Sequence, residues 1–506
     1  MHTHVKLLGL ATAIMAISTS CSKKMAEDAI SSSERSVSAA LAMPTKSTSL
    51  TLDWDKTYQR IDGFGTFGGR IIPFFESAHR DTVMERLFGN NGLQLTIIRS
   101  KILHTYPFDT QTGKVTIKPA GTDINVDPAS NTWKQLNEDQ KEQLGQLWIL
   151  KKVKERYRVP VSIASAWTPP LHMKTRPVIH AQWFNGLNFN CCSSSFAKYL
   201  AGFVKAYQQE GIDFYAISPT NEPENVVSEW DASYWDAKHL GEFITNNLRP
   251  ALRDNGLTTK IIASENAAWG TANSFLDGID KSNVDIFAGH GYPEIIDLPG
   301  LISSKKPRYN QRPAPWSFAS ANKPCWLTEI SDDNGVYDAS MNEGLAFATS
   351  MHKFMAECNI NAFIYWLGVL AIRNNESLIC TAADGSLEYP KTYDVMGQYS
   401  RYVKPGYLRI DATQAANNAG IQVSAYKDPQ QGNFAVVATN PTEEDVRCQI
   451  QLKGFKAGSL TSYLTAANSS RWQEAIAATP AADGSFEVIV PARSVITFTG
   501  QRNAAK

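Results

Sequence analysis

The chain has 506 residues, of which 43% are hydrophobic and 19% are charged, a composition that indicates a folded globular protein and excludes disorder, collagen and coiled coil. Forty-nine basic residues balance forty-nine acidic ones, so no excess charge predicts binding to nucleic acid or to anionic lipid. Most of the twelve tryptophans should pack in the core. In an exported, uncharged protein, such flat apolar rings also suit stacking on sugars.

The first 21 residues have the pattern of an export signal. A basic start precedes an apolar run over 7–17 that is too short to span a bilayer. Small residues then lead to Cys21, which resembles the lipidated first residue of a bacterial lipoprotein, although Ser18 stands where such signals usually carry leucine. A plain cleaved signal is the alternative. We expect an exported bacterial protein, held at a membrane only through a lipid on Cys21, with a flexible tether over 22–48.

The chain has seven cysteines, and six remain when Cys21 of the predicted signal is left out. Disulfides are permitted outside the cytoplasm, but six cysteines allow fifteen pairings and the sequence does not choose among them. Cys191 and Cys192 are adjacent, and no spacing resembles a zinc site. We expect several buried free thiols.

Residues 59–405 alternate short apolar strands with amphipathic helices. The predicted strands are 61–65, 95–100, 161–166, 214–220, 260–264, 286–290, 324–328 and 362–367. The clearest helical patterns are 138–158, 194–209, 234–254, 340–358 and 392–403. Eight strand–helix units over roughly 340 residues predict an α/β fold, a (β/α)8 TIM barrel. The alternative, an open doubly wound sheet, would need a phosphate loop, and the nearest glycine cluster at 63–69 has the wrong spacing.

Beyond residue 405 the pattern changes to short alternating or β-branched segments separated by turns. The predicted strands are 421–427, 434–440, 447–452, 460–465, 486–490 and 495–499. Residues 49–58 also have strand character. We therefore expect one antiparallel β domain built from both chain ends, 49–58 plus 406–502.

Two glutamates stand where barrel enzymes carry their chemistry, just after a strand. Glu222 follows the fourth strand and Glu329 follows the seventh, so both can face the mouth of the barrel. Two such carboxylates are what glycoside hydrolysis needs, and their separation decides between retention and inversion. A structural ion pair is the alternative for either glutamate. Asn221 can hydrogen-bond a sugar 2-hydroxyl, and Glu265, at the end of the fifth strand, is the main competing carboxylate.

Several motifs, in this order, make the chain similar to glycoside hydrolase family 30. They lie at 61–65, 95–99, 164–170, 221–223, 326–329, 396–407 and 410–427. The resemblance implies a β-sandwich side domain on the barrel and retaining chemistry, with Glu222 as acid/base and Glu329 as nucleophile. It also implies that Arg99 keeps Glu329 ionised and that Tyr292 contacts it.

Further binding residues are expected around this pair. Trp167 and Trp366, after the third and eighth strands, can form sugar-stacking walls. His290 is a further candidate, and Arg373 is a weaker one because glucuronate-binding members carry their arginine directly after strand eight. The insert over 102–137 and the loop around Cys191 should wall the cleft. We expect no metal and no cofactor.

The family includes xylanases, β-1,6-glucanases, β-1,6-galactanases and enzymes that cleave glucosylceramide. We expect an endo-acting glycanase on a polysaccharide or oligosaccharide, working as a monomer. One alternative is a noncatalytic glycan-binding lipoprotein on a decayed barrel. Another is a metal- or phosphate-dependent barrel enzyme, which the absence of a ligand cluster in the sequence disfavours.

Overall fold

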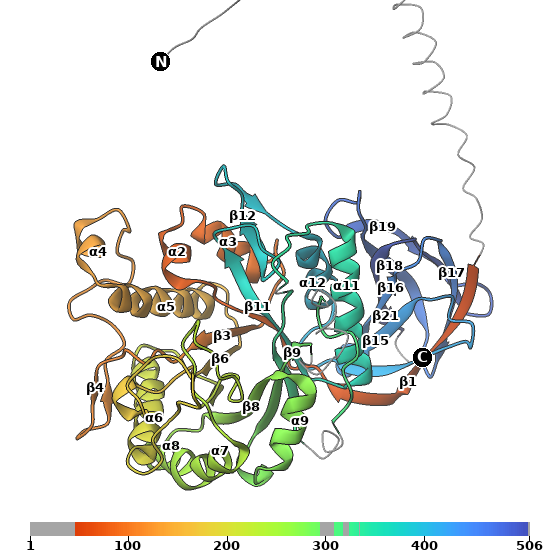
Figure 1. Cartoon of the computed structure of the whole chain (residues 1–506). Helices are drawn as coiled ribbons and strands as arrows, with labels where there is room; N and C mark the ends of the chain where they lie inside the picture. The colour runs from red at the N-terminus through yellow and green to blue at the C-terminus, as the bar shows by residue number, and fades with distance from the viewer. Residues whose placement is uncertain (1–45, 294–307, 317–322, 333, 504–506) are drawn as a thin grey trace, which may run out of the picture. The chain divides into compact units, whose positions relative to one another are not determined.

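The computed structural model describes residues 46–293, 308–316, 323–332 and 334–503 (Figure 1). The predicted signal, the lipidation site Cys21 and the tether up to residue 45 lie outside these ranges. In the part of the chain that is described, no helix has the length and apolar character needed to cross a membrane.

Eight parallel strands close into a barrel, which confirms the predicted fold class. In ring order they are β2 (Gly63–Phe67), β3 (Ile97–Lys101), β6 (Val161–Ser165), β7 (Ala216–Ser218), β8 (Lys260–Ala268), β9 (Ile286–Tyr292), β10 (Cys325–Glu329) and β11 (Ala362–Leu370). Pairing of β11 with both β10 and β2 closes the ring and excludes the open doubly wound sheet.

Apart from Trp326, the barrel interior is filled by small and β-branched side chains, the residue types that fit its narrow width. The interior side chains come from all but one of the ring strands and include Ile97, Ile163, Ala216, Ile262, Ile286, Ala288, Trp326 and Ile364. A larger core lies between the strands and the helices around them. These helices are α2 (Ile71–Glu76), α3 (Arg80–Phe88), α5 (Glu138–Glu155), α6 (Ser193–Gln209), α9 (Trp269–Asp277), α11 (Met341–His352) and α12 (Lys391–Ser400).

The helix predicted over 234–254 consists of three segments. They are α7 (Ala237–Phe243), a π-helical turn η2 (Ile244–Leu248) and α8 (Arg249–Asp254). Pro250 lies in the first turn of α8, and because proline has no backbone N–H to donate, the regular hydrogen-bond ladder is interrupted just before it. A similar π turn, η4 (Lys353–Glu357), extends α11.

Short elements outside the barrel pattern were not predicted. The insert after β3 contains a hairpin of β4 (Phe108–Asp109) and β5 (Lys114–Val115), and the short helix α4 (Asn131–Gln135). Strand β11 runs three residues past its predicted end and pairs with a second hairpin, β12 (Ser377–Thr381) and β13 (Leu387–Glu388). Residue 368 of that extension is a glycine, and a larger residue would not fit, because a Cβ there would lie 2.7 Å from the Leu87 side chain.

The second domain is a sheet of nine strands that uses both chain ends, as predicted. The order is β19 (Gln473–Ala478), β18 (Ala457–Thr465), β21 (Ser494–Arg502), β16 (Asn433–Asn440), β15 (Gln422–Lys427), β14 (Leu408–Gln414), β1 (Lys46–Arg60), β17 (Val446–Lys453) and β20 (Phe486–Val490). Every pairing but one is antiparallel; β1 runs parallel to β17. Strands β14 and β19 were not predicted.

Buried polar contacts join this β domain to the last barrel helix. Gln398 of α12 donates its side-chain amide to Thr465 at 2.8 Å, and the Thr497 hydroxyl donates to the Gln398 side chain at 2.6 Å. The Trp472 indole donates to the carbonyl oxygen of Asp394 at 2.7 Å. Gly397 leaves room for that ring, which a Cβ at this position would overlap.

Candidate active site

The two predicted carboxylates lie together at the carboxyl ends of the barrel strands. Glu329 is the last residue of β10, and Glu222 is in the loop directly after β7. Both side chains are buried. One oxygen of each and Nδ1 of His290 all lie within 4.8 Å of one another, so the pair forms a single compact site.

Glu222 is held through both carboxyl oxygens. Its Oε1 lies 3.0 Å from Nδ1 of His290, and its Oε2 accepts a 2.7 Å hydrogen bond from the side-chain amide of Asn225. Its backbone has a φ of 49°, the left-handed region that non-glycine residues rarely adopt. The Glu222 N–H donates to the carbonyl oxygen of Glu265 at 2.8 Å and anchors this turn. Such local strain, held in place by neighbours, is typical of functional positions.

Glu329 is held by a tyrosine and an arginine. The Tyr292 hydroxyl donates to its Oε1 at 2.8 Å, and Arg99 forms an ion pair with its Oε2. Both contacts agree with the sequence analysis. Burial raises the pKa of Glu329, and the positive charge of Arg99 opposes that shift, which is the direction expected of a cation beside the nucleophile. That Arg99 keeps Glu329 ionised stays a prediction.

Arg99 lies at the centre of the site and is fully buried. Besides Glu329, it donates to Asn221 Oδ1 at 2.6 Å and contacts Glu265 Oε1 at 3.4 Å. Burial alone would lower the pKa of Arg99, but the charges of Glu265 and Glu329 outweigh burial and raise it. Because Asn221 accepts through its oxygen, its NH2 group is the donor that it can offer to a sugar hydroxyl.

His290 is buried and neutral at physiological pH, since burial lowers its pKa to about 4. Its Nε2 is buried without a hydrogen-bond partner in the described structure. With Glu222 and Glu329 it could supply three ligand atoms to a metal ion. The Arg99 guanidinium already binds the other oxygen of Glu329 and would repel a cation. The expectation of a metal-free site stays a prediction.

The two predicted tryptophans are neighbours in an aromatic cluster. Trp366 stacks on Phe67 with ring centroids 5.0 Å apart, and Trp167 lies 5.9 Å from Trp366. The Arg99 guanidinium lies 4.8 Å from the Trp167 ring, which is only 6% exposed. Phe67 was not predicted, although its place at the end of the first barrel strand is the signal that could have identified it. Sugar stacking by the two tryptophans stays a prediction.

Arg373 is engaged away from this cluster, with a partner in the hairpin that follows β11. Its Nε donates to Glu388 Oε2 at 2.7 Å, and its Nη2 contacts the other carboxylate oxygen. A fork-to-fork pair of this kind leaves the guanidinium committed. A role for Arg373 in substrate binding stays a prediction that this ion pair does not favour.

Sequence reasoning missed two residues that act on Glu222 or lie beside it. Asn225 is one, and its position three residues after Glu222 in a polar run is the only local signal. Glu224 is the other: burial raises its pKa to about 7, with a further contribution from the charge of Glu222. Glu224 accepts hydrogen bonds from the Asn266 side chain at 2.9 Å and from the Ala267 backbone at 2.8 Å.

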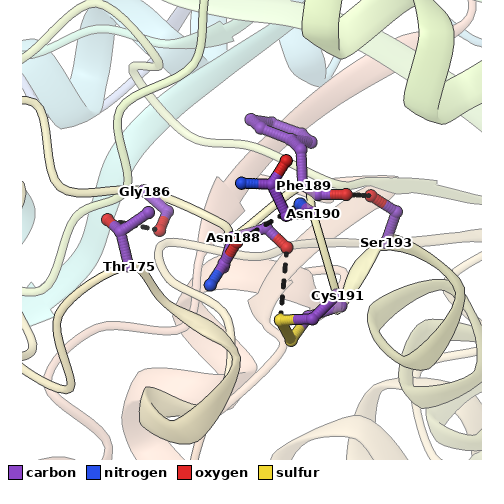
Figure 2. The surroundings of a disulfide bond; sticks show 8 residues. Thr175, Gly186, Asn188, Phe189, Asn190, Cys191 and Ser193 are labelled. Carbon is purple, nitrogen blue, oxygen red and sulfur yellow. Dashed lines mark hydrogen bonds between the residues drawn. A yellow bond between two sulfur atoms is a disulfide. The ribbon is translucent and has the colours of Figure 1, made fainter.

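A cavity of about 550 Å³ lies between two of the loops that follow barrel strands. Its lining combines the insert after β3 with the loop after β6 and includes His104, Tyr106, Phe108, Asp139, His172 and Pro177. That the insert over 102–137 and the loop around Cys191 wall the substrate cleft stays a prediction. Further along the β6 loop, Cys191 and Cys192 form a disulfide directly before α6 (Figure 2). The cysteines at 325, 358, 380 and 448 are buried free thiols, as expected.

Two family models match the chain, in the order of its two domains. The glycosyl hydrolase family 30 TIM-barrel domain matches residues 62–265, and the glycosyl hydrolase family 30 beta sandwich domain matches residues 408–498. The chain belongs to glycoside hydrolase family 30. The carboxylate pair described above therefore lies at the mouth of a family 30 barrel.

Relatives of this family 30 protein carry named glycoside hydrolase activities. Glucuronoxylanase XynC of Bacillus subtilis is 26% identical over 356 residues, covering 68% of this chain and 74% of that protein. The endo-1,6-beta-D-glucanase of Neurospora crassa is 24% identical over 419 residues, covering 79% and 83%. The catalytic domain of the GH30 xylanase C from Talaromyces cellulolyticus has the same fold, with a TM-score of 0.71, 22% identity and coverage of 90% and 100%. The protein is thus a glycoside hydrolase.

Proposed function

We propose that this family 30 hydrolase is a retaining β-glycanase in which Glu329 is the nucleophile and Glu222 the acid/base. The observation that carries the proposal is the close approach of the two buried carboxylates, whose oxygens lie within 4.8 Å. Retaining enzymes separate their carboxyl groups by about 5–5.5 Å, whereas inverting enzymes need about 6.5–9.5 Å to admit a water molecule. The compact pair favours double displacement.

In the first step, Glu329 attacks the anomeric carbon while the glycosidic C–O bond breaks and Glu222 gives its proton to the leaving oxygen. Arg99 and Tyr292 hold the two oxygens of Glu329, so the attacking carboxylate is oriented before substrate arrives. A glycosyl–Glu329 ester results, and the negative charge of that carboxylate is lost.

In the second step, Glu222 takes a proton from a water molecule that attacks the anomeric carbon and releases Glu329. His290 and Asn225 fix the two oxygens of Glu222, so this carboxyl group keeps one position in both steps. Asn221 donates its NH2 group to the sugar 2-hydroxyl, a contact that strengthens in the transition state.

The substrate that we propose is a β-glycan, either xylan or a β-1,6-linked glucan or galactan, cleaved within the chain. The names of the curated relatives, a glucuronoxylanase and an endo-1,6-β-glucanase, support this class. Arg373 argues against dependence on a glucuronate branch, because its guanidinium is paired with Glu388.

We further propose that the protein is exported and anchored through a lipid on Cys21. The support is the apolar run over 7–17 and the small residues before Cys21. Metabolic labelling with a radioactive fatty acid tests this, and Cys21→Ala should abolish both the label and recovery in the membrane fraction. Label that persists in Cys21→Ala would contradict the anchor.

The decisive experiment on mechanism uses two variants with azide as an added nucleophile. Glu222→Ala should form the glycosyl–Glu329 ester and transfer it to azide, giving a β-glycosyl azide. Glu329→Gly leaves room for azide on the opposite face, giving an α-glycosyl azide from an activated substrate. NMR of the products distinguishes the two anomers, and the opposite assignment or an inverted product from the unaltered enzyme would reject the proposal.

The substrate panel consists of xylan, glucuronoxylan, β-1,6-glucan and β-1,6-galactan, with product lengths read by chromatography. Internal cleavage should give a range of oligosaccharides from one of the four. Full turnover by Glu329→Gln on every active substrate would refute the nucleophile assignment. Glycan binding with no release from any member of the panel would instead support a decayed, noncatalytic barrel.

A further inference from the structure

Exposed apolar side chains gather in two loops at the catalytic face of the barrel. Ten large hydrophobic side chains are exposed among the described residues, and six of them lie in the loops that follow β6 and β7. We call these six the loop rim: Val178, Ile179, Trp183, Phe184, Val226 and Trp230. Trp183 is 74% exposed, Phe184 65% and Trp230 46%. Single exposed apolar side chains are ordinary, but several exposed together on neighbouring loops are typical of a binding surface.

The β6 part of the rim is held rigidly by two buried polar side chains. The Lys174 ammonium donates to the carbonyl oxygens of Ile179 at 3.0 Å and Ala232 at 2.7 Å. Asn185 donates its side-chain amide to the carbonyl oxygens of Val178 at 3.3 Å and His180 at 3.0 Å. The exposed rings are therefore displayed from a fixed turn.

The backbone of this turn is strained where the two most exposed rings stand. Trp183 has a φ of 59° and Phe184 a φ of 57°, so two successive bulky residues occupy the left-handed region. Glycine or asparagine would be more stable in that conformation. Strain of this kind persists where the surrounding structure enforces it, and it clusters at ligand-binding positions.

The rim is continuous with the catalytic loops. The Ala181 N–H donates to the carbonyl oxygen of Val227 at 3.1 Å, and the Ala232 N–H donates to that of Ile179 at 3.1 Å. These two bonds tie the β6 loop, which carries Trp167, to the β7 loop, which carries Glu222. A chain that lies across the catalytic pair can extend along these same loops.

We propose that Trp183, Phe184 and Trp230 form a distal binding site for neutral sugar units of a long β-glycan chain, outside the units at the catalytic pair. This inference rests on the proposed function and adds a preference for long substrates. Flat apolar rings stack on the C–H faces of sugars, and the interleaved polar residues His180 and Gln182 can bond hydroxyl groups.

A lipid surface is the competing ligand for exposed aromatic rings. Binding to anionic lipid usually requires a cluster of basic residues beside the rings. In the loop rim there is no such cluster: the exposed Arg176 is offset by the exposed Glu229, Lys174 is buried, and Lys101 is paired with Asp231 at 2.6 Å. The charge pattern therefore favours a neutral glycan over a membrane.

Asparagine variants give a clean test because asparagine tolerates the left-handed backbone. Trp183→Asn and Phe184→Asn should fold with unchanged or higher unfolding temperatures. On the polymer, KM should rise about fivefold for each ring removed, while kcat is unchanged. Activity on a short aryl glycoside should stay as in the unaltered enzyme. Trp183→Tyr should retain most polymer affinity, and Ile489→Thr, an exposed apolar side chain on the β domain, is the matched control.

Pelleting with insoluble polysaccharide separates this proposal from the catalytic one. In short incubations on ice, in the unaltered background and in Glu329→Gln alike, Trp183→Asn should lower the bound fraction severalfold, whether or not Glu329→Gln is inactive. Equal losses on long and short substrates, or an unchanged bound fraction, would overturn the distal site. The proposal would also be overturned if Trp183→Asn reduced pelleting with vesicles of phosphatidylethanolamine and phosphatidylglycerol but left pelleting with polysaccharide unchanged.

Discussion

The buried guanidinium of Arg99 makes the most direct quantitative test of the site. Arg99 is the cation that contacts both Glu329 and Glu265, and Glu222 adds a third carboxyl group to the same cluster. Arg99→Met removes this charge and keeps most of the side-chain volume. Arg99→Lys keeps the charge but loses the planar fork that serves several acceptors at once.

Removal of the charge should act first on the nucleophile. A cation next to a carboxylate lowers the carboxyl pKa by about 1–3, so Arg99→Met should raise the pKa of Glu329 by that amount above its already elevated position. A nucleophile with a higher pKa needs a higher pH to ionise. The acid limb of the kcat/KM profile should therefore move about 1–3 pH units upward, with a much smaller movement for Arg99→Lys.

The same substitution should also destabilise the fold. Breaking one side of a buried ion pair costs about 3–5 kcal/mol, because the remaining carboxyl groups lose their compensating charge. The assays are pH–rate profiles on one hydrolysed substrate and urea unfolding at two pH values. If Arg99→Met folds and its acid limb coincides with that of the unaltered enzyme, the role assigned to Arg99 is wrong.

Three further predictions follow from contacts described above. Tyr292→Phe removes a hydrogen bond worth about 1.5–3 kcal/mol to Glu329, so kcat/KM should fall about 10- to 100-fold with little change in unfolding temperature. Burial raises the pKa of Glu224 to about 7 from an ordinary 4.5, so its native form binds more protons than the unfolded form between these values. The contribution of Glu224 to stability should therefore fall by about 3 kcal/mol as pH rises through that window, and Glu224→Gln should remove that share of the fall in urea unfolding. Gly65→Ala puts a Cβ 2.6 Å from the Ile97 carbonyl oxygen and should cost at least about 1–3 kcal/mol in the same assay.

Each of these three has an outcome that contradicts it. If Tyr292→Phe showed a large drop in unfolding temperature together with its loss of kcat/KM, the hydroxyl would have a structural role. A pH dependence of stability in Glu224→Gln equal to that of the unaltered protein would rule out the raised pKa as its source. Gly68→Ala is the matched control for Gly65, since its Cβ would meet Ile149 only at 3.5 Å; equal destabilisation by the two substitutions would refute the steric argument.

The barrel could be predicted because its signals are local. Each strand is a short apolar run with polar residues at its end, and each helix repeats apolar residues at helical spacing. The same rule located Glu222 and Glu329, since strand ends at one face of a closed ring must converge. Arg99, in the middle of β3, was identified through the family resemblance. The hairpin of β12 and β13, which extends the barrel sheet beyond β11, was not predicted. Gly368 interrupts the apolar run, so the sequence pattern suggested that β11 ends before it, whereas the strand continues to Leu370.

The partners of the catalytic groups could not be predicted in the same way. Contact between Arg99 and Glu265 joins residues 166 positions apart, and no sequence spacing encodes such a distance. The raised pKa of Glu329 could not be predicted either, because the effect of burial depends on how completely neighbouring loops exclude water. The parallel pairing of β1 with β17 was also unexpected, since the sequence pattern predicts an antiparallel β domain.

That β1–β17 pairing determines how the protein would bear mechanical load. Strand β1 is bonded on one edge to β14 and on the other to β17, over most of its length. A force applied at the N-terminal end, as a lipid anchor would apply it, pulls along this strand and loads its two hydrogen-bond ladders in shear. Many bonds must then break together, whereas a hairpin at a sheet edge unzips one bond at a time. The β domain would thus act as a shear-resistant coupling between an anchor and the catalytic barrel.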